Sequence, residues 1–187
     1  MQIGIYGGSF NPVHYGHVGL AKWVAEHTDL DEVWMMVSPN NPLKDSRELA
    51  DEQERLEGVR KAIEGIPHVV ACDFEFSLPR PSYTANTLRA LTAAYPQHTF
   101  SLIIGEDNLR ILPRWREWEY IVSRYRIFVY PRRDAGCSQW SVVSGQLPDN
   151  AQIIMLEDAP YFDISSTEIR NNLKINNPDM SGQVPKI

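Results

Sequence analysis

The sequence predicts an α/β fold in which an open parallel sheet carries helices on both of its faces. Short apolar runs rich in β-branched residues alternate along the chain with longer segments whose apolar residues recur at helical spacing. The run from Val33 to Val37 is apolar throughout, which is typical of a strand buried on both faces. A length of 187 residues suffices for one domain with a sizeable core, so we expect residues 1–187 to form a single domain.

The predicted elements begin with a strand at residues 2–6 and a helix from about Tyr15 to Thr28. Further strands are predicted at residues 33–37, 68–72, 100–104, 126–130 and 153–156, and further helices at 51–66, at 82–95 and from Ser165 onward. Polar loops without clear periodicity lie between them, at residues 38–44 and 132–150. Strands that alternate with helices pair in parallel through right-handed crossovers, which gives the open sheet.

The composition limits the partners and the compartment that we expect. A net charge of −6 argues against broad nucleic-acid binding, which needs a basic surface. Cys72 and Cys137 are too few for a secreted disulfide framework, so we expect reduced thiols in a cytoplasmic protein. The sequence has no run of about 18 apolar residues and no basic, then apolar, leader, so no membrane segment is expected.

The stretch from Ile3 to Gly19 has the features of a phosphate site. The Gly-Gly-Ser turn at 7–9 follows the first strand, and its glycines let the backbone approach a ligand closely. His14 and His17 open the next helix on one face, at the end where unpaired N–H groups and the dipole favour anions. A glycine turn and a capping histidine also occur without a ligand, and neither G-x-x-x-x-G-K-[ST] nor G-x-G-x-x-G is present.

A second candidate phosphate-binding segment lies at the start of the last helix. Ser165 and Glu168 have the spacing of a capping box, which by itself accounts for this hydroxyl and this carboxylate. Arg170 follows Ser166 by four residues and Thr167 by three, so it rises on the same side as their hydroxyls. A guanidinium, a hydroxyl and free helix-start N–H groups together suit a polyphosphate.

Both segments match a known signature. Gly-Gly-Ser-Phe-x-Pro-x-His-x-Gly-His at 7–17 and Ile-Ser-Ser-Thr-x-x-Arg at 164–170 resemble the motifs of the nucleotidylyltransferase superfamily, and the chain is similar nearly end to end to the bacterial nicotinate-nucleotide adenylyltransferases. The resemblance implies a Rossmann-like domain that joins ATP and nicotinate mononucleotide to give nicotinate adenine dinucleotide (deamido-NAD) and pyrophosphate. It also implies Mg²⁺ bound through the ATP phosphates, with no metal held by the protein.

The resemblance assigns the site residues to three groups. These are catalytic (His14, His17 and Arg170), ATP-binding (Gly7, Gly8, Ser9, Phe10, Gly105, Asp107, Ser165 and Ser166) and nicotinate-nucleotide-binding (Lys44, Ser82, Tyr83, Thr84 and Trp115). Several have a structural alternative. Trp115 is also suited to the core, and Lys44 to the solvated surface. Tyr83, Thr84 and Asp107 stand where helix caps are placed.

The chain departs from the family pattern at a few positions. Asn11 and Val13 replace a more usual acid and a more usual proline, Asn86 replaces an Asp or Thr, and Glu106 replaces a small residue. None of these positions supplies a group that the chemistry needs. Relatives continue past a Val-Pro pair into a closing helix, and we expect that helix to be missing from this sequence.

Two other functions and one metal site are alternatives. A different nucleotidylyltransferase, such as a phosphopantetheine or glycerol-phosphate enzyme, has similar phosphate motifs, but the predicted pyridine-nucleotide residues disfavour it. A nucleotide-sensing module without turnover is disfavoured by the complete set of phosphate donors. A zinc ion at His14 and His17 needs a third ligand, and Cys72 and Asp73 lack the spacing of metal ligands.

Overall fold

The computed structural model describes residues 1–39, 49–131, 147–162 and 164–174, which form a six-stranded parallel sheet. The strands are β1 (Gln2–Gly8), β2 (Glu32–Val37), β3 (Val69–Cys72), β4 (Thr99–Gly105), β5 (Arg126–Tyr130) and β6 (Ile153–Met155). Their order is β3-β2-β1-β4-β5-β6, and all neighbours are parallel. The chain therefore moves outward from β1 to β3, returns to β4 on the other side of β1, and continues to β6. This confirms the predicted open sheet and places a topological switch point between β1 and β4.

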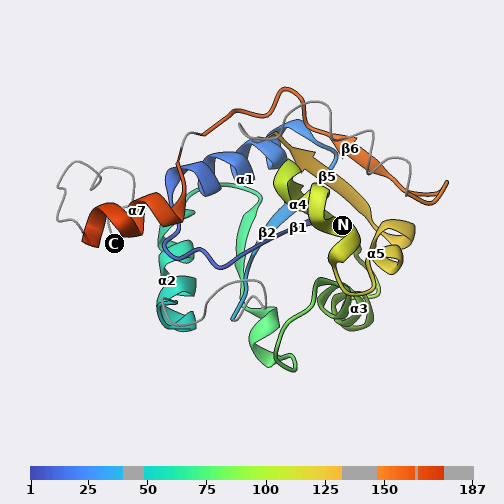
Figure 1. The fold of residues 1–187 in the computed structure, drawn as a ribbon, viewed down its shortest axis with the longest axis horizontal. Helices are drawn as coiled ribbons and strands as arrows, with labels where there is room; N and C mark the ends of the chain where they lie inside the picture. Colours follow the sequence, from blue (N-terminus) through green and yellow to red (C-terminus); the bar gives the residue numbers. More distant parts are fainter. Residues whose placement is uncertain (40–48, 132–146, 163, 175–187) are drawn as a thin grey trace.

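Helices cover both faces of the sheet, as the sequence predicts (Figure 1). They are α1 (Tyr15–His27), α2 (Glu52–Ala62), α3 (Thr84–Ala94), α4 (Glu106–Ile111), α5 (Trp118–Arg124) and α7 (Ser166–Lys174), with the 3₁₀ turns η2 (Phe74–Ser77) and η3 (Leu112–Arg114). Residues of α1 and α2 pack in the apolar cluster on one face, and those of α3, α4 and α5 in the cluster on the other. Within the described ranges, no helix has the length and apolar character needed to cross a bilayer.

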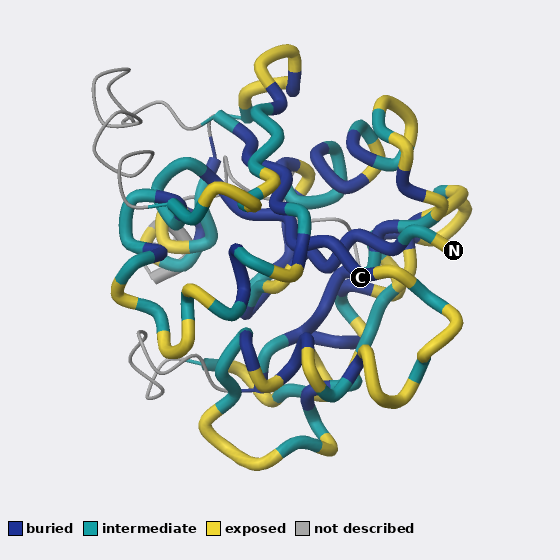
Figure 2. The backbone as a smooth tube through the Cα atoms, turned by 90° about the vertical axis from the view of Figure 1, so that its right-hand side faces the viewer, coloured by how far each residue is buried: buried dark blue, intermediate teal, exposed yellow. Residues whose placement is uncertain are grey.

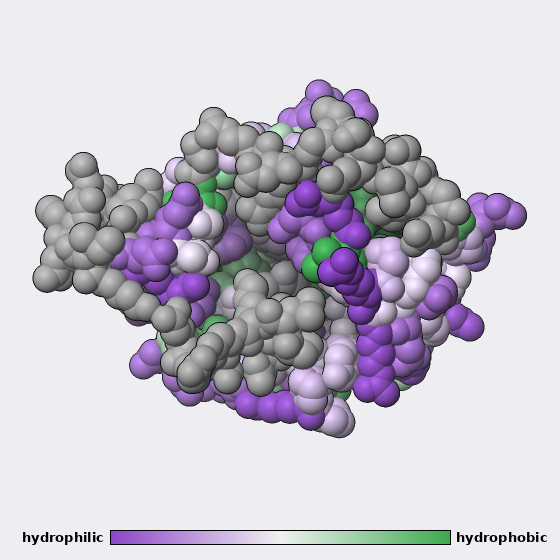
Figure 3. Space-filling model, viewed as in Figure 1, coloured by the Kyte–Doolittle hydropathy of each residue, from purple (hydrophilic) through white to green (hydrophobic). Residues whose placement is uncertain are grey.

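The strands alternate between these two apolar clusters. Along β1, Ile3 and Ile5 belong to the cluster beneath α3 and α5, whereas Tyr6 belongs to the cluster beneath α1 and α2. Side chains of a strand point alternately to the two faces, so a strand buried on both faces is apolar at every position. The central strands are accordingly buried (Figure 2), and the described surface visible in Figure 3 is largely hydrophilic.

The predicted elements differ most from the structure at residues 106–124. The sequence prediction has no helix there, whereas the structure has α4, η3 and α5 in succession. The helices α4 and α5 are 6 and 7 residues long, too short for an apolar period to be recognised. Trp115 lies between η3 and α5, so the loop that carries it is anchored by helical turns on both sides.

Candidate active site

A cavity of about 510 Å³ opens at the carboxyl ends of the strands, at the switch point between β1 and β4. Open parallel sheets bind ligands at this place because the loops after the two strands diverge to opposite faces. The predicted ATP-binding residues of these two loops all line the cavity, namely Gly7, Gly8, Ser9, Phe10, Gly105 and Asp107. The fold thus gathers two segments that are nearly 100 residues apart around one space.

Gly8 and Phe10 shape the turn after β1. Phe10 has a φ of 44°, and its ring occupies the space beside Gly8, where an added Cβ would lie 2.9 Å from the Phe10 Cζ. The Phe10 ring stands edge-on to the ring of His17, with 5.0 Å between their centroids. Because residue 8 is a glycine, the Phe10 ring can pack directly against the backbone at this position. There it also contacts the ring of His17.

His17 lies in the first turn of α1 and lines the cavity. The backbone N–H of His14 donates a hydrogen bond to Nδ1 of His17 at 3.3 Å. Because a backbone N–H can only donate, Nδ1 is unprotonated, and neutral His17 carries its hydrogen on Nε2. His17 is thereby set as a hydrogen-bond donor at the amino end of a helix, where anions are favoured.

His14 lies behind His17 and is not among the described residues that line the cavity. Its side chain is 4% exposed, and its ring stacks on the ring of His17 with 3.6 Å between the centroids. His14 is also the N-cap residue of α1. The shared helical face is therefore as predicted, but the contact of His14 with phosphate stays a prediction.

The C-terminal motif packs against the N-terminal one. Oγ of Ser166 donates to the carbonyl oxygen of Pro12 at 3.0 Å, and Nη1 of Arg170 donates to that of Asn11 at 2.6 Å. Ser166 also lines the same cavity as His17. The two motifs, 154 residues apart between Pro12 and Ser166, thus meet at one turn of the chain.

Gly16 makes this approach possible. A Cβ added at Gly16 would lie 2.8 Å from Cγ2 of Ile164 and 3.0 Å from Cβ of Phe162, closer than packed carbon atoms stand. The glycine between the two histidines therefore lets the segment before α7 lie directly on the first turn of α1.

Ser165 and Arg170 are placed beside the cavity rather than in its wall. Oγ of Ser165 accepts a hydrogen bond from the backbone N–H of Glu168 at 3.2 Å and donates one to the Glu168 carboxylate at 2.7 Å. Ser165 therefore caps the helix, which was the structural alternative for this residue. Nη2 of Arg170 donates to Oγ1 of Thr167 at 3.3 Å. Neither Ser165 nor Arg170 is among the described residues that line the cavity, so their contacts with ATP stay predictions.

The predicted pyridine-nucleotide residues Ser82, Tyr83, Thr84 and Trp115 line the cavity. Trp115 packs against the apolar cluster beneath α3 and α5 and also forms part of the cavity wall, whereas its contact with the pyridine nucleotide stays a prediction. Its Nε1–H is buried without a hydrogen-bond partner among the described residues. Tyr83 occupies the N-cap position of α3 but provides no side-chain cap bond. Lys44 lies outside the described residues.

Comparison with known proteins decides the family. The cytidylyltransferase-like family model matches residues 5–172. A protein of Bacteroides fragilis named "Probable nicotinate-nucleotide adenylyltransferase" is 49% identical over 172 residues, covering 92% of this chain and 82% of that protein. A protein of the same name from Flavobacterium johnsoniae is 45% identical over 179 residues, covering 93% and 87%. The chain belongs to the nicotinate-nucleotide adenylyltransferase family.

Solved structures of this adenylyltransferase family share the fold. The nicotinic acid mononucleotide adenylyltransferase of Plasmodium falciparum, in complex with NaAD, superposes with a TM-score of 0.74 at 20% identity and covers 92% of this chain and 83% of its own. The same protein in complex with APC gives a TM-score of 0.72 at 19% identity, with the same coverage. The Rossmann-like parallel sheet that the sequence predicts is thus the fold that this chain shares with these solved structures.

Glu75 is a residue of the adenylyltransferase cavity that sequence reasoning missed. It comes from η2, lines the cavity and is 6% exposed. Oγ1 of Thr87 donates to Oε1 of Glu75 at 2.7 Å, whereas Oε2 has no hydrogen-bond partner among the described residues. Burial raises the pKa of the Glu75 carboxyl, and the nearby hydroxyls of Thr87, Ser38 and Ser82 counteract burial only in part. The one feature of the sequence that indicates a buried Glu75 is its position between Phe74 and Phe76.

Arg55, the second missed residue, is 4% exposed in α2 and joins two loops of the site. Its guanidinium donates to four backbone carbonyls, those of Ser9 at 2.6 Å, Ser38 at 2.8 Å, Pro39 at 3.2 Å and Ala50 at 3.0 Å. The turn after β1 and the turn after β2 are therefore held by one side chain. The signal in the sequence was the position of Arg55 four residues before Val59, on the apolar face of its helix.

The described residues contain no group of three or more His, Cys, Asp or Glu side chains arranged to hold a metal ion. Cys72, one of the two candidates for a third zinc ligand, is a half-buried thiol at the end of β3. Burial raises the pKa of Cys72 to about 11, which disfavours the thiolate that a metal would need.

We expect Cys72 to react slowly with thiol reagents. In a Cys137→Ser variant at pH 8, iodoacetamide should modify Cys72 at least about tenfold more slowly than free cysteine, because the thiolate is scarce at this pH. Mass spectrometry of timed samples measures the rate, and the same variant unfolded in urea is the control that should react like free cysteine. A native rate equal to the unfolded rate would contradict the raised pKa.

Proposed function

We propose that this protein transfers the adenylyl group of ATP to nicotinate mononucleotide, forming nicotinate adenine dinucleotide and pyrophosphate. An oxygen of the 5′-phosphate of the mononucleotide attacks the α-phosphorus of ATP in line and forms the new P–O bond. The bond from the α-phosphorus to the oxygen that bridges to the β-phosphate breaks, and its electron pair leaves with pyrophosphate. The attacking oxygen is already anionic at neutral pH, so no side chain has to remove a proton.

The observation that carries this proposal is that three separate parts of the chain line one cavity. His17 comes from α1, Ser166 from α7 and Tyr83 from the start of α3. The volume of about 510 Å³ lies within the range of about 300–1,000 Å³ that small-molecule sites occupy. Hydrogen-bond donors arranged around one cavity suit a reaction in which the protein positions the two substrates and stabilises the negative charge that develops on the phosphate oxygens.

Each phosphate-binding residue has a role in this proposal. His17 donates through its Nε2–H to the phosphate oxygens on which charge develops, and His14 fixes the tautomer of His17 through its backbone N–H. Ser166 and Arg170 hold the β- and γ-phosphates from the start of α7. Their bonds to the carbonyls of Pro12 and Asn11 keep α7 against the turn that carries the N-terminal motif.

ATP enters as its Mg²⁺ complex in this proposal. Asp107 lines the cavity, but the described residues form no cage of carboxylates around it. Mg²⁺ keeps several waters and suits a site where substrate phosphates supply its oxygen ligands, so the fit is through ATP rather than through the protein. When bound there, the ion neutralises charge on the phosphates.

The test is product formation from ATP and a set of acceptors. The purified protein is given ATP and Mg²⁺ with nicotinate mononucleotide, nicotinamide mononucleotide, phosphopantetheine or glycerol phosphate, and pyrophosphate release and the dinucleotide are measured. We expect kcat/KM to be about tenfold higher for the acid than for the amide, because the amino end of α3 favours a carboxylate.

Three results would contradict the proposal in different ways. Equal kcat/KM for the two pyridine mononucleotides would remove the acid preference. Turnover of phosphopantetheine or glycerol phosphate in place of the pyridine nucleotides would make the protein a different nucleotidylyltransferase. Binding of ATP without any product would make it a nucleotide-sensing module.

A further inference from the structure

The end of η3 and the loop that follows it bring two cations to the cavity. Arg114 and Arg116 flank Trp115, and all three residues line the cavity. The guanidinium of Arg116 lies over the ring of Tyr83, 4.9 Å from its centroid. Tyr83 is the N-cap residue of α3, so this cation lies on the side chain that precedes the first turn of that helix.

The carboxylates near Arg116 leave its charge largely uncompensated. Glu117 is the neighbour in sequence, but its Oε2 accepts from Nη2 of Arg89 at 2.7 Å, whereas its Oε1 is 4.0 Å from Nε of Arg116. No closer ion pair of Arg116 is present among the described residues. Glu75 and Asp107 line the same cavity, but neither forms an ion pair with Arg116 among the described residues, and burial disfavours the ionised form of Glu75. The cation is therefore free to pair with an anion from solution.

The amino end of α3 adds positive potential at the same place. This helix is 11 residues long, and its N-cap residue Tyr83 makes no side-chain cap bond. The first N–H groups of a helix point beyond its end, where the dipole is positive. The guanidinium and the helix end thus adjoin the same tyrosine from two different elements, a combination that suits a planar anion at the cavity wall.

We propose that Arg116 is a specificity-determining residue whose guanidinium binds the carboxylate of the nicotinate ring, together with the amino end of α3. This inference rests on the proposed function, in which nicotinate mononucleotide occupies this cavity. The carboxylate is the group that distinguishes the acid from its amide, and the fork of a guanidinium matches a carboxylate in two parallel hydrogen bonds. Stacking on Tyr83 limits the freedom of the Arg116 side chain, so less conformational entropy is lost when the acid binds.

The test compares both mononucleotides in the full-length wild type and in Arg116→Ala. We expect the variant to lose about tenfold in kcat/KM and in affinity for nicotinate mononucleotide, and to stay within about twofold for nicotinamide mononucleotide. Calorimetric titration gives the two dissociation constants, including that of an acceptor with slow turnover. Arg116→Lys should recover only part of the acid preference, because an ammonium keeps the charge without the fork.

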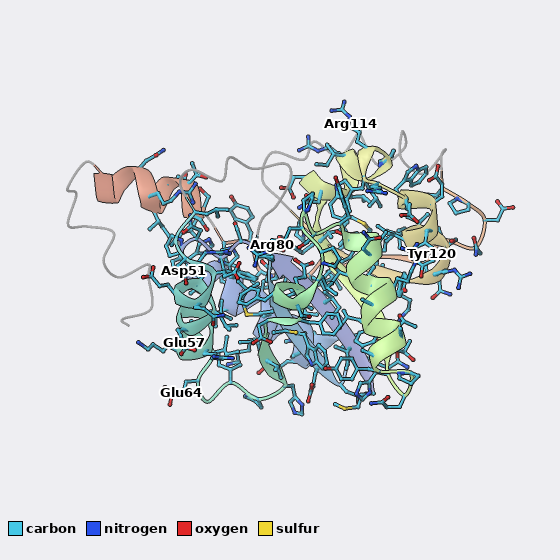
Figure 4. The ribbon with its side chains drawn as sticks, turned by 90° about the horizontal axis from the view of Figure 1, so that it is seen from below. Asp51, Glu57, Glu64, Arg80, Arg114 and Tyr120 are labelled. Atoms are coloured by element: carbon cyan, nitrogen blue, oxygen red, sulfur yellow. The ribbon has the colours of Figure 1, made fainter. Side chains whose placement is uncertain are left out.

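Arg124→Ala is the matched control. The guanidinium of Arg124 also lies over a tyrosine ring, that of Tyr120 at 5.2 Å, but neither residue is among the described residues that line the cavity. Figure 4 shows Tyr120 on the opposite side of the molecule from Asp51, the N-cap residue of α2. We expect this variant to bind and convert both mononucleotides like the wild type.

The outcomes separate this inference from the proposed function. If Arg116→Ala lowers kcat/KM and affinity equally for the acid and the amide, the role of Arg116 in specificity is overturned. Arg116 would then contact a group that both mononucleotides share, or support the fold. An Arg116→Ala variant with unchanged kcat/KM and affinity for both mononucleotides would overturn it as well. A wild type that binds both mononucleotides but forms no dinucleotide would instead overturn the proposed function, while the two affinities would still report on Arg116.

Discussion

Replacing His17 with alanine is expected to lower kcat by about 100-fold or more. The residue lines the cavity, and the bond from the His14 backbone N–H to its Nδ1 places the hydrogen of the neutral ring on Nε2. Removing one preorganised donor from a site of developing negative charge costs about 3 kcal/mol of transition-state stabilisation. The measurement is the rate of pyrophosphate release at saturating ATP and nicotinate mononucleotide.

His27→Ala is the control for this variant because it removes an imidazole from the same helix. His27 lies in the last turn of α1, is exposed, and stacks on Trp23 with 4.6 Å between the ring centroids. It is not among the described residues that line the cavity, so kcat should stay within about twofold of the wild type. Near-normal turnover of the His17 variant would refute the donor role.

Replacing Arg55 with methionine is expected to lower the free energy of unfolding by about 3 kcal/mol or more. The substitution keeps much of the side-chain volume but removes all four hydrogen bonds to backbone carbonyls. Acceptors left without a donor in a buried place carry the full cost of their desolvation. Urea unfolding measures the change as a shift in the midpoint at constant slope.

Arg60→Met on the same helix is the matched control. Arg60 is about half exposed and pairs with Glu57 and, at 3.7 Å, with Asp73. Exposed ion pairs of this kind contribute less than about 1 kcal/mol, so the midpoint should hardly move. If both variants unfold at the same urea concentration as the wild type, Arg55 does not hold the two turns together as its contacts indicate.

Local patterns were enough to predict the sheet and the two phosphate motifs. A strand buried on both faces, such as Val33 to Val37, is recognisable because every position must be apolar. The motif residues are recognisable because their order along the chain is itself the signal. The short helices α4 and α5 were missed because 6 or 7 residues hold too little of an apolar period.

Burial and partners of single side chains could not be predicted in the same way. His14 and His17 have equivalent places in the motif, yet packing buries His14 and leaves His17 at the cavity. Ser165 and Ser166 are neighbours, yet one hydroxyl caps α7 and the other reaches the N-terminal turn. Helical spacing sets the face of a residue, but only the element packed on that face decides whether it meets protein or ligand.

The sequence by itself determined the parallel α/β sheet, the family motifs and the kind of ligand for which they are suited, because apolar periodicity and motif spacing are properties of consecutive residues. That the two motifs meet was predicted from the sequence, but only the tertiary structure decided that they meet through the carbonyls of Asn11 and Pro12, that Arg55 ties two loops together, and that Glu75 and Arg116 share the cavity. These contacts join residues that lie far apart along the chain or on different elements. Such contacts form only when the strands have paired and the helices have packed on them.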